Sequence, residues 1–401
     1  MPNTAISAEP RATYAPASEQ GTTRRVASID VVRGGIMILM ALDHVRDYVT
    51  NLRIRPEDLA RGSAALFATR WITHFCAPGF FLLAGIGIGI SAQRSTLADV
   101  RRFLVTRGIW LLFLELVVTA IGWQFGFQLV PAFAIVIWAL GLSMMLLALV
   151  VGLPHALIAM IALLLIGAHN LFDGVRPESL GALAPLWHIL HVPGLAIPGK
   201  LIVAYPLVPW VGVMALGFVI ADMYRWDAAR RRKTLLWAGV AATAAFIALR
   251  AFNGYGNPFP WSPQRTPALT VASFLNLLKY PPSLQFLLMT LGPLMIALAL
   301  TENARGRIAS VVQVYGRVPL FYYVVHIFLV HALAVGLALM QGGELRRIPV
   351  VSAPETIPAW YGVSLPGVYL AWATVVVLMY WPCRWFGRIK AERKEWWLRY
   401  L

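Results

Sequence analysis

About ten long apolar runs follow one another along the chain, and short polar segments separate them. A helix needs about 20 apolar residues to cross the ~30 Å hydrocarbon core of a bilayer, and most of the runs approach that length. The pattern therefore predicts an all-α, polytopic membrane protein with about ten transmembrane helices. The predicted spans cover residues 29–49, 71–92, 104–125, 129–151, 154–171, 201–222, 234–252, 283–300, 314–340 and 365–386.

The charged residues set the orientation of these spans. Only 13% of the 401 residues are charged, whereas soluble domains carry roughly 25%. A formal net charge of +16 would suggest nucleic-acid binding in a soluble protein. Here the basic residues gather in alternate connections, as is typical of cytoplasmic loops, so we expect no nucleic acid. We place both termini in the cytoplasm and the chain in an inner membrane. The residues of this basic face include Arg94, Arg101, Arg102, Arg107, Arg225, Arg230, Arg231, Arg232, Lys233, Arg305, Arg307 and Arg317.

The chain divides into one large domain and two tails. Residues 1–25 lack apolar periodicity and predict a disordered cytoplasmic tail. Residues 26–390 form a single transmembrane domain, and residues 391–401 form a basic cytoplasmic tail. The two cysteines, Cys76 and Cys383, make no zinc motif or disulfide framework, so we expect no metal. The glycines of GIGIG at 85–89 lie inside a span and indicate close helix packing.

Ionisable side chains inside the spans are the candidate functional residues, because each is costly to bury in a membrane. Asp30 and Arg33 are three residues apart and share a helix face near the cytoplasmic end. They suit either a structural ion pair or part of a site for an anionic ligand. Glu115 lies inside the third span and needs a partner. His326 lies in the middle of the ninth span, and the alternatives are a hydrogen-bonded core histidine and a site residue.

Two further histidines are expected at one membrane depth near the outer face. His44 lies near the outer end of the first span, and His74 opens the second. Histidine titrates near neutral pH and can accept a proton from an amine or a hydroxyl. A carboxylate beside it, Asp43 or Asp47, could orient the ring. The alternative is an interfacial histidine bonded to a backbone carbonyl.

Several of these stretches resemble a known family. They are SIDVVRG (28–34), LMALDH (39–44), WITHFCAP (71–78), FLLAG (81–85), YPLVPWVGVM (205–214), KYPPS (279–283) and LGP (291–293), with a weaker echo at 315–326. Together they resemble the DUF1624 family, which is grouped with the catalytic domain of heparan-α-glucosaminide N-acetyltransferase among the transmembrane acyltransferases. KYPPS and LGP are similar to its bacterial branch.

The resemblance implies transfer of an acetyl group from cytoplasmic acetyl-CoA, or another acyl-CoA, to a sugar amine or hydroxyl on the outer side. The acceptor would be a glycan or a lipid-linked sugar. The family's outer-side histidine lies in a connecting loop that has no histidine here, so His44, His74 and Asp43 are the catalytic candidates by their chemistry. The candidate donor-binding residues are Asp30, Arg33, Arg101, Arg102 and Arg317. The candidate residues on the acceptor side are Asp47, Trp261, Lys279, Tyr280 and His326.

Two other functions fit parts of the same pattern. A proton-coupled secondary transporter would also need membrane histidines and carboxylates, although paired broken helices and inverted repeats are not evident. A non-catalytic membrane partner of an envelope complex would need neither. The lipid bilayer is a partner in every case, and the sequence leaves room for a homo-oligomer.

Overall fold

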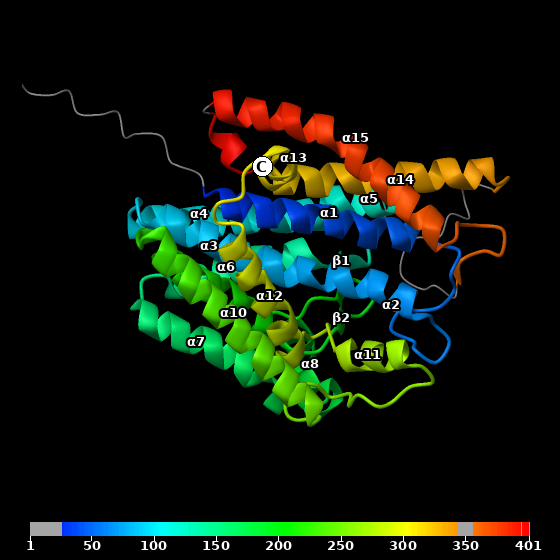
Figure 1. The fold of residues 1–401 in the computed structure, drawn as a ribbon, viewed down its shortest axis with the longest axis horizontal. Coiled ribbons are helices and arrows are strands. Elements are labelled where there is room, and N and C mark those ends of the chain that lie inside the picture. Colours follow the sequence, from blue (N-terminus) through cyan, green and yellow to red (C-terminus); the bar gives the residue numbers. More distant parts are fainter. Residues whose placement is uncertain (1–25, 128, 344–355, 394, 401) are drawn as a thin grey trace, which may run out of the picture.

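The computed structural model describes residues 26–127, 129–343, 356–393 and 395–400. The predicted N-terminal tail at 1–25 therefore lies outside the described residues. Most of the helices run roughly along the long axis of the molecule, and helix α1 (Ala27–Val49) lies among them (Figure 1). We call the end where α1 begins the basic end of the bundle and the end where α1 finishes the loop end.

Within the described residues, six helical stretches are long and apolar enough to cross a membrane. They confirm the prediction of an all-α, multi-pass membrane protein. These stretches are Ala64–Ala92 (α2 Ala64–Trp71, η1 Ile72–Phe75 and α3 Cys76–Ala92), Leu97–Trp123 (within α4 Leu97–Phe113, η2 Leu114–Thr119 and α5 Ala120–Gln124), Val208–Arg225 (α9 Val208–Ile220 and η5 Ala221–Arg225), α10 (Ala228–Ala251), α14 (Pro319–Met340) and α15 (Leu365–Glu392). Three shorter apolar helices accompany them, namely α6 (Val136–Val150), α7 (His155–Gly167) and α12 (Leu284–Leu300).

Helix α1 is long, and charged residues of both signs lie near each of its ends. It contains Asp30, Arg33, Asp43, Arg46 and Asp47. It packs against α3, α12, α13, α14 and α15, so neighbouring helices surround it. A charged helix at the centre of an apolar bundle is the arrangement expected of a functional element, because protein groups rather than lipid can then satisfy its charges.

The structure corrects three of the predicted spans in detail. The ninth, 314–340, is two helices, because α13 (Arg307–Gly316) ends before Pro319 starts α14. The fourth and sixth begin with short strands, β1 (Ala132–Ala134) and β3 (Leu201–Val203), which pair in parallel, and β2 (Gly194–Ile197) pairs antiparallel with β3. The long connections also contain helices, α8 (Ala184–Leu190) and α11 (Pro267–Leu275).

Glycines let two pairs of helices approach closely. A Cβ atom on Gly85 would lie 2.1 Å from the carbonyl oxygen of Met214, so α3 and α9 touch along the glycine run that predicted close packing. A Cβ atom on Gly34 would lie 2.0 Å from the carbonyl oxygen of Val312, which brings α13 against α1. The contact between α1 and α13 fixes the backbone around Asp30 and Arg33 at the basic end.

Alanine at Gly34 is expected to destabilise the protein by roughly 1–3 kcal/mol, because α13 must move away from α1 to admit the methyl group. Gly35 is the matched control, since it lies in the same helix and a Cβ atom there meets nothing within 4 Å. Gly35→Ala should be neutral or slightly stabilising, because alanine favours a helix. Thermal unfolding of the purified variants in detergent measures the difference. Equal losses at the two positions would contradict the packing argument.

Candidate active site

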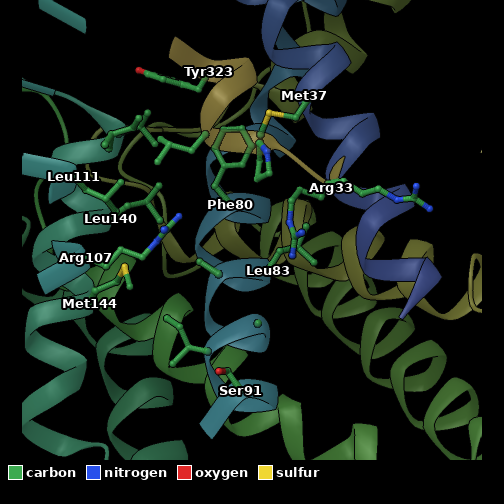
Figure 2. Close-up of a pocket in the computed structure, with 18 of the residues that line it drawn as sticks. Arg33, Met37, Phe80, Leu83, Ser91, Arg107, Leu111, Leu140, Met144 and Tyr323 are labelled. Atoms are coloured by element: carbon green, nitrogen blue, oxygen red, sulfur yellow. The ribbon is translucent and has the colours of Figure 1, made fainter. Parts of the chain in front are cut away.

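A cavity of about 380 Å³ enters the bundle from the basic end. Residues of α1, α3, α4, α6 and α14 line it, and Figure 2 shows Ser91 and Tyr323 at its two ends with the side chain of Arg107 between them. Most of its wall is apolar. The apolar lining includes Met37, Phe80, Leu83, Leu111, Leu140 and Met144.

The polar lining of the cavity is mainly basic. Arg33, Arg107, Arg317 and Lys390 all contribute to it, with Asp30 as the one carboxylate among the described lining residues. Arg33 contacts Asp30 at 3.3 Å and donates to the carbonyl of Gly316 at 3.1 Å. The pair is therefore both a structural contact between α1 and α13 and part of the cavity wall.

Three of the five predicted donor-binding residues line this cavity, and two do not. Asp30, Arg33 and Arg317 are in the wall, whereas Arg101 and Arg102 are exposed on α4 and are not among the described lining residues. Arg107, about one and a half turns further along α4, takes their place. The positive-inside pattern finds basic residues near this face, but it does not say which side of a helix they occupy.

The deep end of the cavity is braced by Glu115. This carboxylate lies in a π-helical turn, η2, and accepts hydrogen bonds from the backbone N–H groups of Ile137 and Trp138 at 2.8 and 3.2 Å. Thr119 donates to its other oxygen at 2.9 Å. Glu115 thus satisfies the free N–H groups at the start of α6, which is the partner that its sequence position required.

The central feature beyond the cavity is a pair of histidines from helices far apart in sequence. The Nδ1 atom of His44 lies 2.7 Å from the Nε2 atom of His326. His326 is fully buried, and its Nδ1 atom lies 2.9 Å from the carbonyl oxygen of Tyr322. His44 is only partly buried. The structure therefore places His326 beside His44.

The hydrogen bonds fix the protonation pattern of the neutral pair. A carbonyl oxygen only accepts, so His326 donates from Nδ1 and must accept at Nε2. His44 then donates from Nδ1, and the lone pair on its Nε2 atom remains available. An imidazole held in this way can accept a proton or attack an acyl group, and His326 sets its orientation.

Tyr323 connects the cavity with the histidine pair. It lines the cavity, and its ring centroid lies 6.2 Å from that of His44 and 5.7 Å from that of His326. The edge of Trp123 packs against His44 on another side, with centroids 4.9 Å apart. The cavity thus ends one aromatic ring away from the pair. Tyr323 was not among the candidate residues predicted from the sequence. Its position one helical turn before His326 is the feature that could have indicated it.

The carboxylates near His44 do not orient its ring as predicted. Asp43 binds Arg70 through both oxygens, at 2.7 and 2.5 Å, and contacts Arg46 at 2.8 Å. Asp47 is held by Arg46 at 2.5 Å. Both carboxylates therefore serve a cluster of ion pairs at the loop end, because two nearly buried arginines attract them more strongly than a neutral imidazole can.

The remaining predicted residues lie around this cluster. His74 is buried in η1 with its ring 5.3 Å from that of Phe286. The described contacts of His44 do not include it. Tyr280 shares a hydroxyl contact of 3.3 Å with Tyr205. Trp261 packs on Phe274 in the connection before α12, with ring centroids 5.6 Å apart.

One family model matches residues 25–252, more than half of the chain, and it describes the catalytic domain of heparan-alpha-glucosaminide N-acetyltransferase. The chain belongs to this family. It is thereby a member of a family of membrane acetyltransferases, as the motifs in the sequence indicate. No curated protein sequence shows significant similarity to the chain.

The heparan-alpha-glucosaminide N-acetyltransferase match covers only part of the site. Asp30, Arg33, His44 and Arg107 lie within the matched residues, whereas Tyr323 and His326 lie beyond them. The family domain thus contributes the cavity wall from α1, α3, α4 and α6. Helices α14 and α15, with Arg317 at the end of α13, complete it, and α14 supplies the second histidine.

Proposed function

We propose that this protein transfers an acetyl group from acetyl-CoA, or another acyl-CoA, to an amine or hydroxyl of a sugar on the other side of the membrane. The donor enters at the basic end, which faces the cytoplasm of a bacterial cell, and the acceptor is a glycan or a lipid-linked sugar at the loop end. The observation that carries this proposal is the cavity, which runs from four basic side chains to Tyr323 beside the histidine pair.

The two parts of the cavity wall match the two parts of an acyl-CoA. Arginine and lysine side chains bind phosphate groups with strong, charge-assisted hydrogen bonds. Arg33, Arg107, Arg317 and Lys390 are the residues that would hold the phosphates. The apolar wall formed by Phe80, Leu83 and Leu111, among others, suits the less polar arm that carries the acyl group.

His44 has the chemistry that the transfer needs. Its free Nε2 atom can take the proton from the attacking amine or hydroxyl and give it to the CoA thiolate that leaves. Alternatively, it can attack the thioester, release the thiolate and carry the acyl group in transit. His326 would stabilise the positive charge that forms on His44, because its Nε2 atom accepts the hydrogen bond from His44. The surrounding rings of Trp123 and Tyr323 restrict water access, which favours transfer to the acceptor over hydrolysis.

The test is acetyl-CoA binding by the full chain in detergent, measured by calorimetry. We expect Arg107→Met to weaken binding about 10- to 100-fold, because a charge-assisted hydrogen bond contributes roughly 1.5–3 kcal/mol. Arg101→Met is the matched control on the same helix, since Arg101 is exposed and is not among the described cavity residues. It should bind acetyl-CoA like the unmodified protein.

Two results would contradict the proposal. No heat signal with any acyl-CoA would remove the donor site. Acceptor-dependent proton uptake into liposomes without any acyl-CoA would instead favour proton-coupled transport.

A further inference from the structure

The loop end of the bundle contains a cluster of opposite charges in which one cation makes no direct ion pair with the described residues. Arg70 binds Asp43 and also contacts Glu57 at 3.0 Å, while Arg46 binds Asp43 and Asp47. Every carboxylate of this cluster is thus paired with an arginine. The third cation is Lys279, in the connection between α11 and α12. It balances the charge of the three carboxylates but makes no direct ion pair within the described part of the chain.

Lys279 is buried without a hydrogen-bond acceptor in the described part of the chain. Its residue is only 7% exposed. The one contact of its ammonium group given by the described residues is with the ring of Tyr280, 5.2 Å from Nζ to the centroid. Its Nζ atom is not among the fully buried polar atoms that lack a partner, so the ammonium group keeps some contact with solvent. An anionic ligand can therefore reach it, and a hydrogen bond to a charged group is stronger than one to a neutral group.

The backbone around Lys279 holds it in a fixed position. Lys279 and Pro282 form a β-bridge, and the N–H of Ser283 donates to the carbonyl of Leu278 at 2.9 Å. Pro282 in turn accepts a hydrogen bond from the Nε2 atom of His169 at 2.9 Å. The ammonium group is thus presented from a braced turn, which lowers the entropy cost of binding a ligand there.

Lys279 acts on the Tyr280 hydroxyl and is close to the histidine pair. Burial raises the pKa of the Tyr280 hydroxyl, but the positive charges of Lys279 and Arg70 and the hydrogen bond with Tyr205 outweigh it and leave the pKa below its ordinary value. Lys279 also lies within electrostatic range of Asp43 and His44. A negative group held by Lys279 would therefore lie near the reacting imidazole.

We propose that Lys279, with the Tyr280 hydroxyl beside it, forms a subsite for a negatively charged group, a phosphate or a carboxylate, on the acceptor. The identity of the reaction in this inference rests on the proposed function. The binding of the anion at Lys279 does not depend on it. It assigns the acceptor to the anionic sugars and makes Lys279 a determinant of specificity. The anion would be held at the loop end while the amine or hydroxyl reaches His44.

Turnover with matched acceptors tests the subsite. Acetyl transfer from acetyl-CoA is measured with glucosamine 6-phosphate and with muramic acid, and each kcat/KM is divided by the value for glucosamine. In Lys279→Gln we expect both ratios to fall about tenfold or more, and Lys279→Arg should restore part of the preference. Lys200→Gln is the control, because Lys200 is an exposed lysine in the turn between β2 and β3; its ratios should not change. An equal loss for charged and uncharged acceptors in Lys279→Gln would overturn the subsite.

A binding measurement without acetyl-CoA separates this inference from the proposed function. Tryptophan fluorescence of the full chain in phosphatidylcholine nanodiscs follows the binding of glucose 6-phosphate, glucuronate and glucose. Tighter binding of the two anions, lost in Lys279→Gln and kept in Lys200→Gln, supports the subsite even if acetyl-CoA does not bind. Displacement of the sugar anions by added phosphatidylglycerol would assign the phosphate to a lipid-borne group, and no displacement would assign it to a free sugar. Equal affinity for glucose and the two anions would overturn the proposal.

Discussion

Replacement of His44 by alanine is expected to abolish acetyl transfer while leaving acetyl-CoA binding and thermal stability nearly unchanged. The Nε2 atom of His44 is the free nitrogen of the pair, and no described residue takes a hydrogen bond from it or donates one to it. Loss of a general base typically lowers the rate by roughly 10²–10⁴. Loss of an acyl carrier would lower it further, because the covalent route would be closed.

Variants of His326 and His74 allow the loss of transfer activity to be compared with that of His44→Ala. His326→Gln keeps His44 but replaces the imidazole that accepts its Nδ1 proton, so we expect a smaller loss of kcat with an unchanged KM for the acceptor. His74→Ala should have the least effect, because His74 packs on Phe286 away from the pair. Transfer rates and acetyl-CoA affinity are measured for all three variants in the same detergent. Full activity in His44→Ala, or complete loss confined to His74→Ala, would contradict the assignment to His44.

The positions of the membrane helices could be predicted because the length of an apolar run and its interruptions are local properties of the sequence. The same reasoning located the Gly85 contact, since glycine has few other uses inside a span. It failed at β1 and β3, because three apolar residues in a strand resemble the start of an apolar helix. It also missed the end of α13, where Pro319 opens a new helix rather than continuing the old one.

The site was only partly predictable, because its geometry depends on which faces of distant helices meet. His44 and His326 are 282 residues apart, and neither shows its partner locally. Adjacent residues in a helix point about 100° apart, so Asp43 turns towards Arg70 while His44 turns towards α14. Sequence proximity suggested a carboxylate and imidazole pair, but helical geometry separates the two side chains.

Replacement of Asp43 by asparagine tests that separation, and it is expected to cause a large loss of stability. The carboxylate binds Arg70 and Arg46, whose side chains are 11% and 5% exposed. Removing one member of a buried ion pair typically costs about 3–5 kcal/mol, because the remaining charge is left without compensation. The apparent unfolding temperature of Asp43→Asn in detergent should therefore fall by several degrees. Asp58→Asn is the control, because Asp58 pairs with Arg61, whose side chain is 64% exposed, and its loss should change little.

A double variant shows whether the ion pair causes this loss. If it does, Asp43→Asn combined with Arg70→Gln should be less destabilised than the sum of the two single changes, since both charges are then removed. The opposite result is equally clear. An unchanged unfolding temperature with a strongly reduced kcat in Asp43→Asn would mean that Asp43 acts on His44 during the reaction. Stability and turnover measured on the same samples thus decide whether the Asp43-His44 sequence pair is one functional unit, or two residues that serve opposite sides of α1.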